Sequence, residues 1–195
     1  MLFTIPFTKW LAMRLVTERL LKVCSLVTFA NNENQIEIDS YHKLSYGLFV
    51  VTARDGEKDN GCISNTAIQV ALNPDRMAIA LQNNSLTGEM VKKTGKLNVS
   101  VLCENVPFEV IRHFGMQSGR DVDKFANCDV DTRAKNGIKY IPKYTGAFFS
   151  LDIISSTDVG SHTLFVGDVT EAKVLSGESP CTYAYYHQNI KPKKS

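Results

Sequence analysis

Side chains that could bind a ligand are concentrated in the stretch NGCISNTA, residues 60–67. A strand packed in a core would carry large apolar residues at these positions. Ser64, Asn65 and Thr66 instead provide hydrogen-bonding groups, and their small size lets a flat molecule approach the backbone. The next residues, IQVAL at 68–72, have the composition of a buried strand. The sequence therefore predicts an edge that faces a polar ligand, followed directly by a buried strand.

Two further stretches have residues suited to binding. In QNNSLTGEM, residues 82–90, Ser85 precedes a predicted helix, so its hydroxyl, that of Thr87 and the free backbone N–H groups could hold a phosphate. The alternative is that Ser85 only caps the helix. In GSHTLFVGDV, residues 160–169, His162 stands at the entrance of a predicted strand, where barrels bind ligands. A purely structural role for His162 is the alternative there.

Motifs of several common reaction classes are absent from the sequence. There is no GxSxG or HExxH motif, which speaks against a nucleophile elbow and a zinc-protease helix. There is no GxGxxG after a strand, so a nucleotide would not be held as in a Rossmann fold. The five cysteines are widely spaced without a CxxC pair, so no metal site is expected. Thiols spaced in this way are expected to be reduced, as in a cytoplasmic protein.

The overall composition indicates a globular protein with little net charge. The apolar fraction is 44% and the formal net charge is only +2. This balance supports one domain with a core and provides no strong electric field for binding nucleic acid. A small barrel that binds nucleic acid is disfavoured for a second reason, because Lys and Arg are not interleaved with aromatic residues.

Most of the elements that must position the candidate residues are predicted to be strands. Polar runs between the apolar ones predict turns, of which DGEKDNG at 55–61 is one. Helices are predicted only in connections: one starts at Ser85 and is ended by Gly95, and the other has Pro107 near its first turn and Gly115 directly after it. Residues 115–145 form a long loop of a kind that is often functional. Many short strands predict a mainly β fold of barrel type rather than a parallel α/β sheet. The predicted strands are at residues 46–54, 67–72, 76–82, 96–102, 146–155 and 162–175.

Residues 1–38 differ in character from the rest of the chain. Arg14, Glu18 and Lys22 recur every four residues, with apolar residues on another face, which predicts an amphipathic helix. These charges interrupt the apolar run before it reaches the length of a membrane span, and their interleaving is unlike that of a secretory signal. Such a helix could bind a membrane surface or a partner. The alternatives are an extension packed on the domain and a segment without function.

Taken in order, five stretches resemble the flavin reductase family, which has an FMN-binding split-barrel fold. They are YGLFVVTARDG, NGCISNTAIQVALNPDRMAIAL, NNSLTGEMVKKTGKLNVSVL, FEVIRHFGMQSGRDVDKF and GSHTLFVGDV, within roughly residues 41–190. The chain resembles in particular the flavin reductase module that precedes rubredoxin in high-molecular-weight rubredoxins. In those chains a YYHxxIKP-like end runs into the iron-binding domain. Here no CxxC pairs follow YAYYHQNIKPKKS, so a rubredoxin is not expected in this chain.

The resemblance implies a fold, a chemistry and partners. It implies a Greek-key split β-barrel with short connecting helices at residues 39–195, with residues 1–38 as an extension outside it. It implies a homodimer that binds FMN non-covalently at its interface and takes a hydride from NADH or NADPH. Electrons would pass to a rubredoxin-like or flavodiiron acceptor. The alternative is an FMN-binding electron carrier, similar to a flavoredoxin, without significant NAD(P)H turnover.

The resemblance also implies roles for individual residues. Residues 60–67 would be a loop along the isoalloxazine ring and ribityl chain, Asn84, Ser85 and Thr87 would hold the phosphate, and His162 would be the catalytic residue on the nicotinamide side. The complete implied flavin-binding set is Asn60, Gly61, Cys62, Ile63, Ser64, Asn65, Thr66, Ala67, Asn84, Ser85, Thr87 and His162.

This chain departs from the family pattern at two of these places. The family often has Gly-Asp-His where this chain has Gly160, Ser161 and His162, which puts in doubt a carboxylate that orients the histidine. Many relatives have Met, Val or Leu at the position of Cys62. The thiol is therefore either redox-sensitive beside the flavin or a small buried filler.

Overall fold

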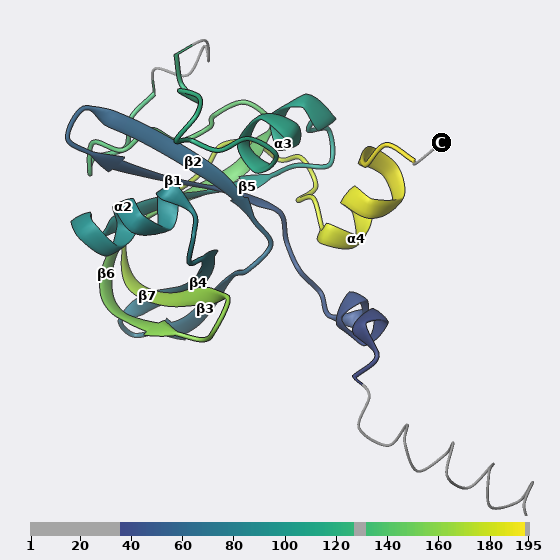
Figure 1. The fold of residues 1–195 in the computed structure, drawn as a ribbon, viewed down its shortest axis with the longest axis horizontal. Helices are drawn as coiled ribbons and strands as arrows, with labels where there is room; N and C mark the ends of the chain where they lie inside the picture. The colour runs from purple at the N-terminus through teal and green to yellow at the C-terminus, as the bar shows by residue number, and fades with distance from the viewer. Residues whose placement is uncertain (1–35, 127–131, 194–195) are drawn as a thin grey trace, which may run out of the picture. The chain divides into compact units, whose positions relative to one another are not determined.

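The computed structural model of the 195-residue chain describes residues 36–126 and 132–193 (Figure 1). The chain divides into two units, residues 1–44 and residues 45–195. The described part of the first unit contains the 3₁₀ helix η1 (Ile38–Lys43). The amphipathic helix predicted around residues 13–27 lies outside the described residues. Among the helices of the described ranges, none has the length and apolar character that a membrane crossing requires.

The second unit is built on one seven-stranded antiparallel sheet, so the prediction of a mainly β fold is confirmed. Its strands follow the order β2-β1-β5-β6-β7-β4-β3. Their bounds are β1 (Phe49–Asp55), β2 (Lys58–Ser64), β3 (Ala67–Leu72), β4 (Asp75–Gln82), β5 (Lys96–Leu102), β6 (Thr145–Asp158) and β7 (His162–Val174).

The two edge strands of this sheet, β2 and β3, follow one another in the chain and are joined only by Asn65 and Thr66. At this link the Ser64 hydroxyl donates to the Ala80 carbonyl of β4 over 3.1 Å, and the Ala80 N–H donates to the Thr66 carbonyl over 3.2 Å. Elsewhere in the described ranges, β2 pairs only with β1. The sheet therefore curls until its edges meet at one point and stays open beside it, which is the arrangement of a split barrel.

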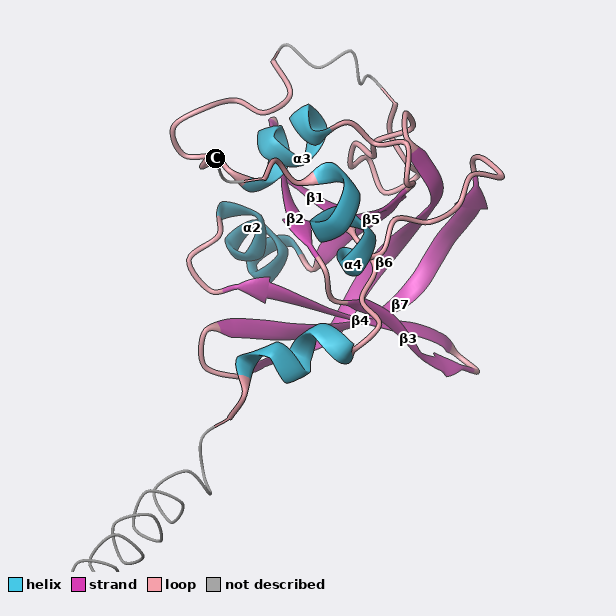
Figure 2. Ribbon diagram, turned by 90° about the vertical axis from the view of Figure 1, so that its right-hand side faces the viewer, coloured by secondary structure: helices cyan, strands magenta, loops and turns pink. Residues whose placement is uncertain are grey.

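Helix α2 (Leu86–Thr94) lies between the β1–β2 and β3–β4 hairpins (Figures 1 and 2) and packs chiefly against β1. Its Met90 and Val91 pack in one hydrophobic core with Val51 of β1. The opposite face of β1 belongs to a second core, in which Val50 is grouped with residues of α3 (Phe108–Gly115). Because both faces of β1 are covered, this strand is apolar along most of its length.

The chain end packs on the same side as α3. It contains α4 (Tyr183–Tyr185) and the π-helix η2 (Tyr186–Ile190). Cys181 and Tyr186 are buried in the second core. Cys62, Cys103 and Cys181 are free thiols, while Cys24 and Cys128 lie outside the described residues.

Local sequence signals predicted both helices well. The Ser85 side chain caps α2 by accepting from the Gly88 N–H, and Gly95 ends the helix in the left-handed conformation with φ 69°. Helix α3 begins after Pro107 as expected, but Gly115 is its last residue rather than the first residue beyond it. In the described part of residues 116–144 there is no helix or strand, only one isolated bridge, so the predicted long loop is confirmed.

The turn predicted at residues 55–61 is too long. Only Gly56 and Glu57 separate β1 from β2, and residues 58–61 already pair with β1. The Asp59 carboxylate accepts two hydrogen bonds from the Arg133 guanidinium, over 3.0 and 2.8 Å. A polar residue of β2, Asp59, thus has its partner in a distant loop. For the same reason the loop predicted at residues 60–67 is wrong, because residues 60–64 belong to this strand.

The prediction of a buried strand at residues 68–72 is also wrong. Strand β3 forms as expected, but Ile68, Val70 and Leu72 are 56%, 47% and 77% exposed. The strand is at the edge of the sheet, and among the residues that the structure describes it pairs with β4 alone. The apolar composition therefore predicted a strand correctly. It did not predict whether other elements of the chain would cover the faces of that strand.

Candidate functional site

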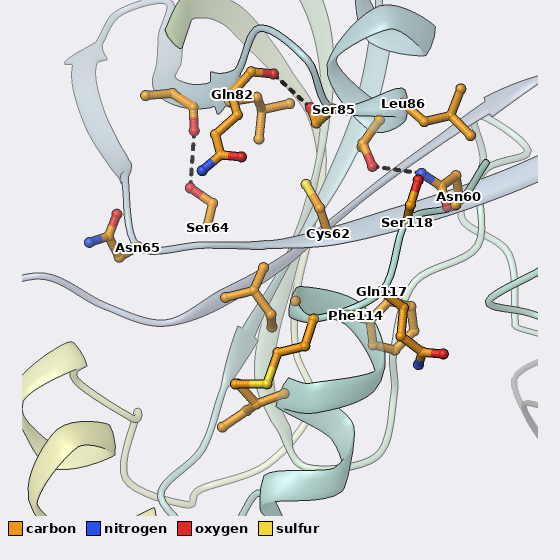
Figure 3. Close-up of a pocket in the computed structure, with 18 of the residues that line it drawn as sticks. Asn60, Cys62, Ser64, Asn65, Gln82, Ser85, Leu86, Phe114, Gln117 and Ser118 are labelled. Atoms are coloured by element: carbon orange, nitrogen blue, oxygen red, sulfur yellow. Dashed lines mark hydrogen bonds between the residues drawn. The ribbon is translucent and has the colours of Figure 1, made fainter. Parts of the chain in front are cut away.

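A cavity of about 640 Å³ lies beside the open seam of the sheet. This volume is within the range of about 300–1,000 Å³ typical of sites for small molecules and cofactors. One wall is formed by β2, the link to β3, the end of β4 and the start of α2. The facing wall is formed by the end of α3, the residues after it, and Tyr183 and Tyr186 of the chain end. Figure 3 shows Cys62 and Ser85 on the first wall and Phe114 and Gln117 on the second.

The cavity brings together the three stretches that the sequence singled out. Ten of the twelve residues predicted to bind flavin are among the described residues that line it: Asn60, Cys62, Ile63, Ser64, Asn65, Thr66, Asn84, Ser85, Thr87 and His162. Gly61 and Ala67 do not line it. A Cβ atom added at Gly61 would lie 3.1 Å from the Phe114 ring. Ala67 is buried in the first core.

The N-terminus of α2 opens into this cavity through Ser85, Leu86 and Thr87. The Ser85 hydroxyl donates to the Gln82 carbonyl over 2.8 Å and accepts from the Gly88 N–H over 3.0 Å, so the capping role of Ser85 is confirmed. The first N–H groups of a helix have no intrahelical partner, and the helix dipole adds positive charge there. This end of α2 is therefore suited to an anion, chiefly through its backbone.

Thr87, which is buried, and Cys62, which is partly buried, form a polar pair in the cavity lining. The Thr87 side chain is fully buried, and its Oγ1 accepts from Asn60 Nδ2 over 3.0 Å. Burial raises the pKa of the Cys62 thiol above its usual value, while a hydrogen bond from Thr87 and the charge of Lys124 act in the opposite direction. Cys62 is therefore a neutral thiol at neutral pH. Because the Thr87 hydroxyl already has protein partners, it is less available to a ligand than the sequence suggested.

His162 is the first residue of β7 and directly follows the three-residue connection from β6. The Ser161 hydroxyl is hydrogen-bonded to His162 Nδ1 over 2.8 Å. The Asp158 carboxylate instead accepts from the Gly160 N–H over 2.8 Å, and this bond is the main reason why the pKa of Asp158 is lowered. A serine rather than a carboxylate is thus the partner of the imidazole, as the Gly-Ser-His sequence implied.

Asn83 fixes this connection to the start of α2. Its Nδ2 donates to the Gly160 carbonyl over 2.7 Å, and its Oδ1 accepts from the Thr163 hydroxyl over 2.5 Å. The Asn83 N–H also donates to the Ser161 carbonyl over 3.1 Å. The resemblance implied a role for Asn84 and not for Asn83. Nothing local to this pair of asparagines distinguishes the one that reaches across to β7.

Sequence reasoning missed the second wall almost completely. Residues 115–119 line the cavity together with Lys124, Tyr183 and Tyr186. The stretch was recognised only as part of a long loop, although its Gly and Ser residues directly after a helix were a usable signal. No pattern in the sequence marked Lys124 as buried.

Gly119 lets the second wall approach β2 closely. A Cβ atom at this position would lie 2.1 Å from Asn60 Oδ1, and Asn60 is itself only 2% exposed. We expect Gly119→Ala to displace Asn60 and break its bond to Thr87, lowering the free energy of unfolding by about 1–3 kcal/mol. Flavin affinity should fall with it. Gly177→Ala is the matched control, because nothing lies within 4 Å of a Cβ there. Equal melting temperatures for the two variants would contradict this account.

Comparison with protein families gives one extensive match. The flavin reductase like domain family matches residues 41–194. The chain is 36% identical over 153 residues to the high molecular weight rubredoxin of Moorella thermoacetica, covering 78% of this chain and 66% of that protein. The chain thus spans slightly less than two thirds of that relative. It is 34% identical over 152 residues to the ferric-chelate reductase (NAD(P)H) of Archaeoglobus fulgidus, covering 78% of this chain and 89% of that protein.

Solved structures with the same fold include two that are named for flavins. The NADH:FAD oxidoreductase of Streptomyces globisporus matches with a TM-score of 0.69 at 22% identity, covering 79% of this chain and 90% of the other. The FMN-binding protein of Thermus thermophilus matches with a TM-score of 0.66 at 20% identity, covering 75% and 80%. At these identities the likeness concerns the fold, and it agrees with the predicted split barrel.

Proposed function

The chain belongs to the flavin reductase like domain family, and from this premise we propose that it is an NAD(P)H:flavin oxidoreductase. In this proposal FMN binds in the cavity at the seam of the sheet, and electrons pass on to a rubredoxin-like or flavodiiron acceptor. The relative from Moorella supports a rubredoxin-like acceptor, because that protein is named a high molecular weight rubredoxin. The ferric-chelate reductase supports NADH or NADPH as the electron donor.

The observation that carries the proposal is the chemistry of the cavity walls. Asn65, Thr66 and Gln82 provide amide and hydroxyl groups on one wall, beside the open N-terminus of α2. The other wall presents apolar side chains, Ile111, Phe114 and Met116, beside polar residues. A flavin mononucleotide has matching parts, namely a flat heteroaromatic ring with a polar edge and a phosphate. The residues present therefore fit the cofactor.

Within this proposal each group of residues has a distinct task. A bound flavin would supply the redox chemistry, which is acceptance of a hydride from a dihydronicotinamide and transfer of electrons to an acceptor. Residues 60–66 orient the ring and ribityl chain, the backbone N–H groups at the start of α2 hold the phosphate, and His162 contacts the nicotinamide side. The Ser161 hydroxyl, 2.8 Å from Nδ1, sets the orientation of the His162 imidazole.

We further propose that the active form is a homodimer. Ile68, Val70 and Leu72 expose an apolar face on an edge strand, and proteins that remain monomeric usually cover or charge such edges. A second copy of the chain, applying the same face, would bury it. Strand β3 is joined to the cavity residues of β2 by only two residues, so this interface would adjoin the flavin site.

The domain and its location complete the proposal. We propose residues 39–195 as the flavin-binding domain and residues 1–38 as an extension to it. The family match, which begins at residue 41, supports this boundary. The free thiols of Cys62, Cys103 and Cys181 support a reducing compartment, and we place the protein in the cytoplasm.

The direct test is anaerobic reduction of the full chain reconstituted with FMN. We expect FMN to bind and its absorption band to bleach when NADH or NADPH is added, with recovery on addition of an oxidised rubredoxin. Bleaching by dithionite but by neither nicotinamide would select the electron-carrier alternative. Failure to bind any flavin would contradict the proposal as a whole.

A further inference from the structure

The cavity has one formally charged residue in its lining. Among the described residues that line it, Lys124 is the only Lys, Arg, Asp or Glu. Lys124 is 3% exposed, so water screens its charge poorly. Any ligand in the cavity therefore experiences the field of Lys124 with little opposition from other side chains.

Lys124 is held rigidly between the two walls. Its Nζ donates to the Gly61 carbonyl of β2 and to the Phe114 carbonyl in the last turn of α3, each over 2.8 Å. Its own carbonyl is hydrogen-bonded to His113 Nε2 over 2.7 Å. These contacts fix the ammonium group beside β2 rather than leaving it on a flexible chain.

The surroundings of the ammonium group act on its charge in opposite directions: burial disfavours the charged form, and two hydrogen-bond acceptors favour it. Burial lowers the pKa of Lys124 from its ordinary value. Both hydrogen-bond acceptors are carbonyl oxygens, and one belongs to the negative end of a helix dipole, where cations are stabilised. An ammonium group has three N–H donors, and two are used by these carbonyls.

We propose that Lys124 is the residue that makes this cavity bind reduced flavin more tightly than oxidised flavin. The inference rests on the proposed function. A hydride brings two electrons with one proton, so the dihydronicotinamide C–H bond breaks, an N–H bond forms on the flavin, and one extra negative charge enters the cavity. A fixed cation beside that charge stabilises the reduced state and leaves the neutral oxidised ring nearly unaffected.

The test is a measurement of the midpoint potential of the bound flavin, by reductive titration against a reference dye at pH 8, where imidazole groups are generally neutral. In the natural chain the potential should be more positive than that of free flavin. In Lys124→Gln, whose amide can donate to the same two carbonyls, the preference for reduced flavin should fall at least tenfold, about 30 mV for a two-electron couple. Lys124→Arg should keep the preference.

Controls separate this role from others. Lys96→Gln removes one exposed positive charge at the start of β5 and should leave the potential unchanged. Riboflavin should show the same shift as FMN, because the charge is proposed to act on the ring. A shift with FMN alone would assign Lys124 to the phosphate and overturn the inference. Circular dichroism and melting curves establish that each variant is folded.

Two results would overturn the inference while leaving the proposed function intact. One is a natural chain that binds FMN with a potential equal to or more negative than that of free FMN, a measurement that needs no variant. The other is a Lys124→Gln protein that is folded, binds flavin and shows an unchanged potential. A natural chain that binds no flavin would instead contradict the proposed function itself.

Discussion

Replacing Ser85 by Asp is expected to weaken FMN binding about 100- to 1,000-fold while leaving riboflavin binding nearly unchanged. Asp is as good an N-cap as Ser, so α2 should stay folded and continue to receive the Gly88 N–H. The new carboxylate would stand at the helix end where the phosphate is proposed to bind. Two like charges about 4 Å apart at an effective dielectric constant near 20 repel by about 4 kcal/mol.

The measurement is a fluorescence titration with FMN and riboflavin in parallel. Ser85→Asn is the matched control, because it caps the helix without a charge. It should retain FMN affinity within about tenfold. An equal loss of both ligands in Ser85→Asp would show that the ring is affected, and unchanged FMN binding would place the phosphate elsewhere in the cavity.

A double replacement on the exposed edge strand, Ile68→Lys with Leu72→Lys, is expected to convert the proposed dimer to a monomer. These side chains are 56% and 77% exposed in the single chain, so the fold of the monomer should tolerate the lysines. In an interface the four added charges of two copies would lie close together and lose their hydration, which costs several kcal/mol. Because the proposed interface adjoins the flavin site, FMN affinity should fall as well.

Sedimentation velocity of the natural chain and the variant decides this prediction. Val174→Lys is the control, because Val174 is 82% exposed and lies at the end of β7, beyond the residues that pair with β4. It should leave the dimer intact. A dimer that persists in the double variant, or a natural chain that is monomeric at all concentrations, would contradict the proposed use of β3.

The sequence was sufficient for the elements that depend on near neighbours. The cap of α2 is a bond between Ser85 and Gly88, three residues apart, and Gly95 ends the same helix by its own conformational freedom. The strands other than β2 could be recognised from apolar and β-branched runs, since their residues must cover at least one face of a sheet. The position of His162 at a strand entrance is equally local.

Distant contacts explain where the sequence analysis failed. Residues 58–61 were predicted to be part of a turn because the run 55–61 combines two glycines with three acidic residues. Asp59 is in fact paired with Arg133, 74 residues further along the chain. Ile68 was expected to be buried because it is apolar, but exposure depends on whether another element crosses its face. Neither fact can be deduced from a window of a few residues.

The sequence alone determined the mainly β fold, the two helices, and three stretches that line the cavity, because these follow from periodicity, capping and side-chain chemistry. The resemblance to a family then supplied a candidate ligand. Only the tertiary structure decided the second wall and the place of Lys124, whose ammonium group reaches the Gly61 carbonyl 63 residues away. Burial of a charge is a property of everything packed around it, and that packing exists only after the sheet has curled and α3 has folded against β2.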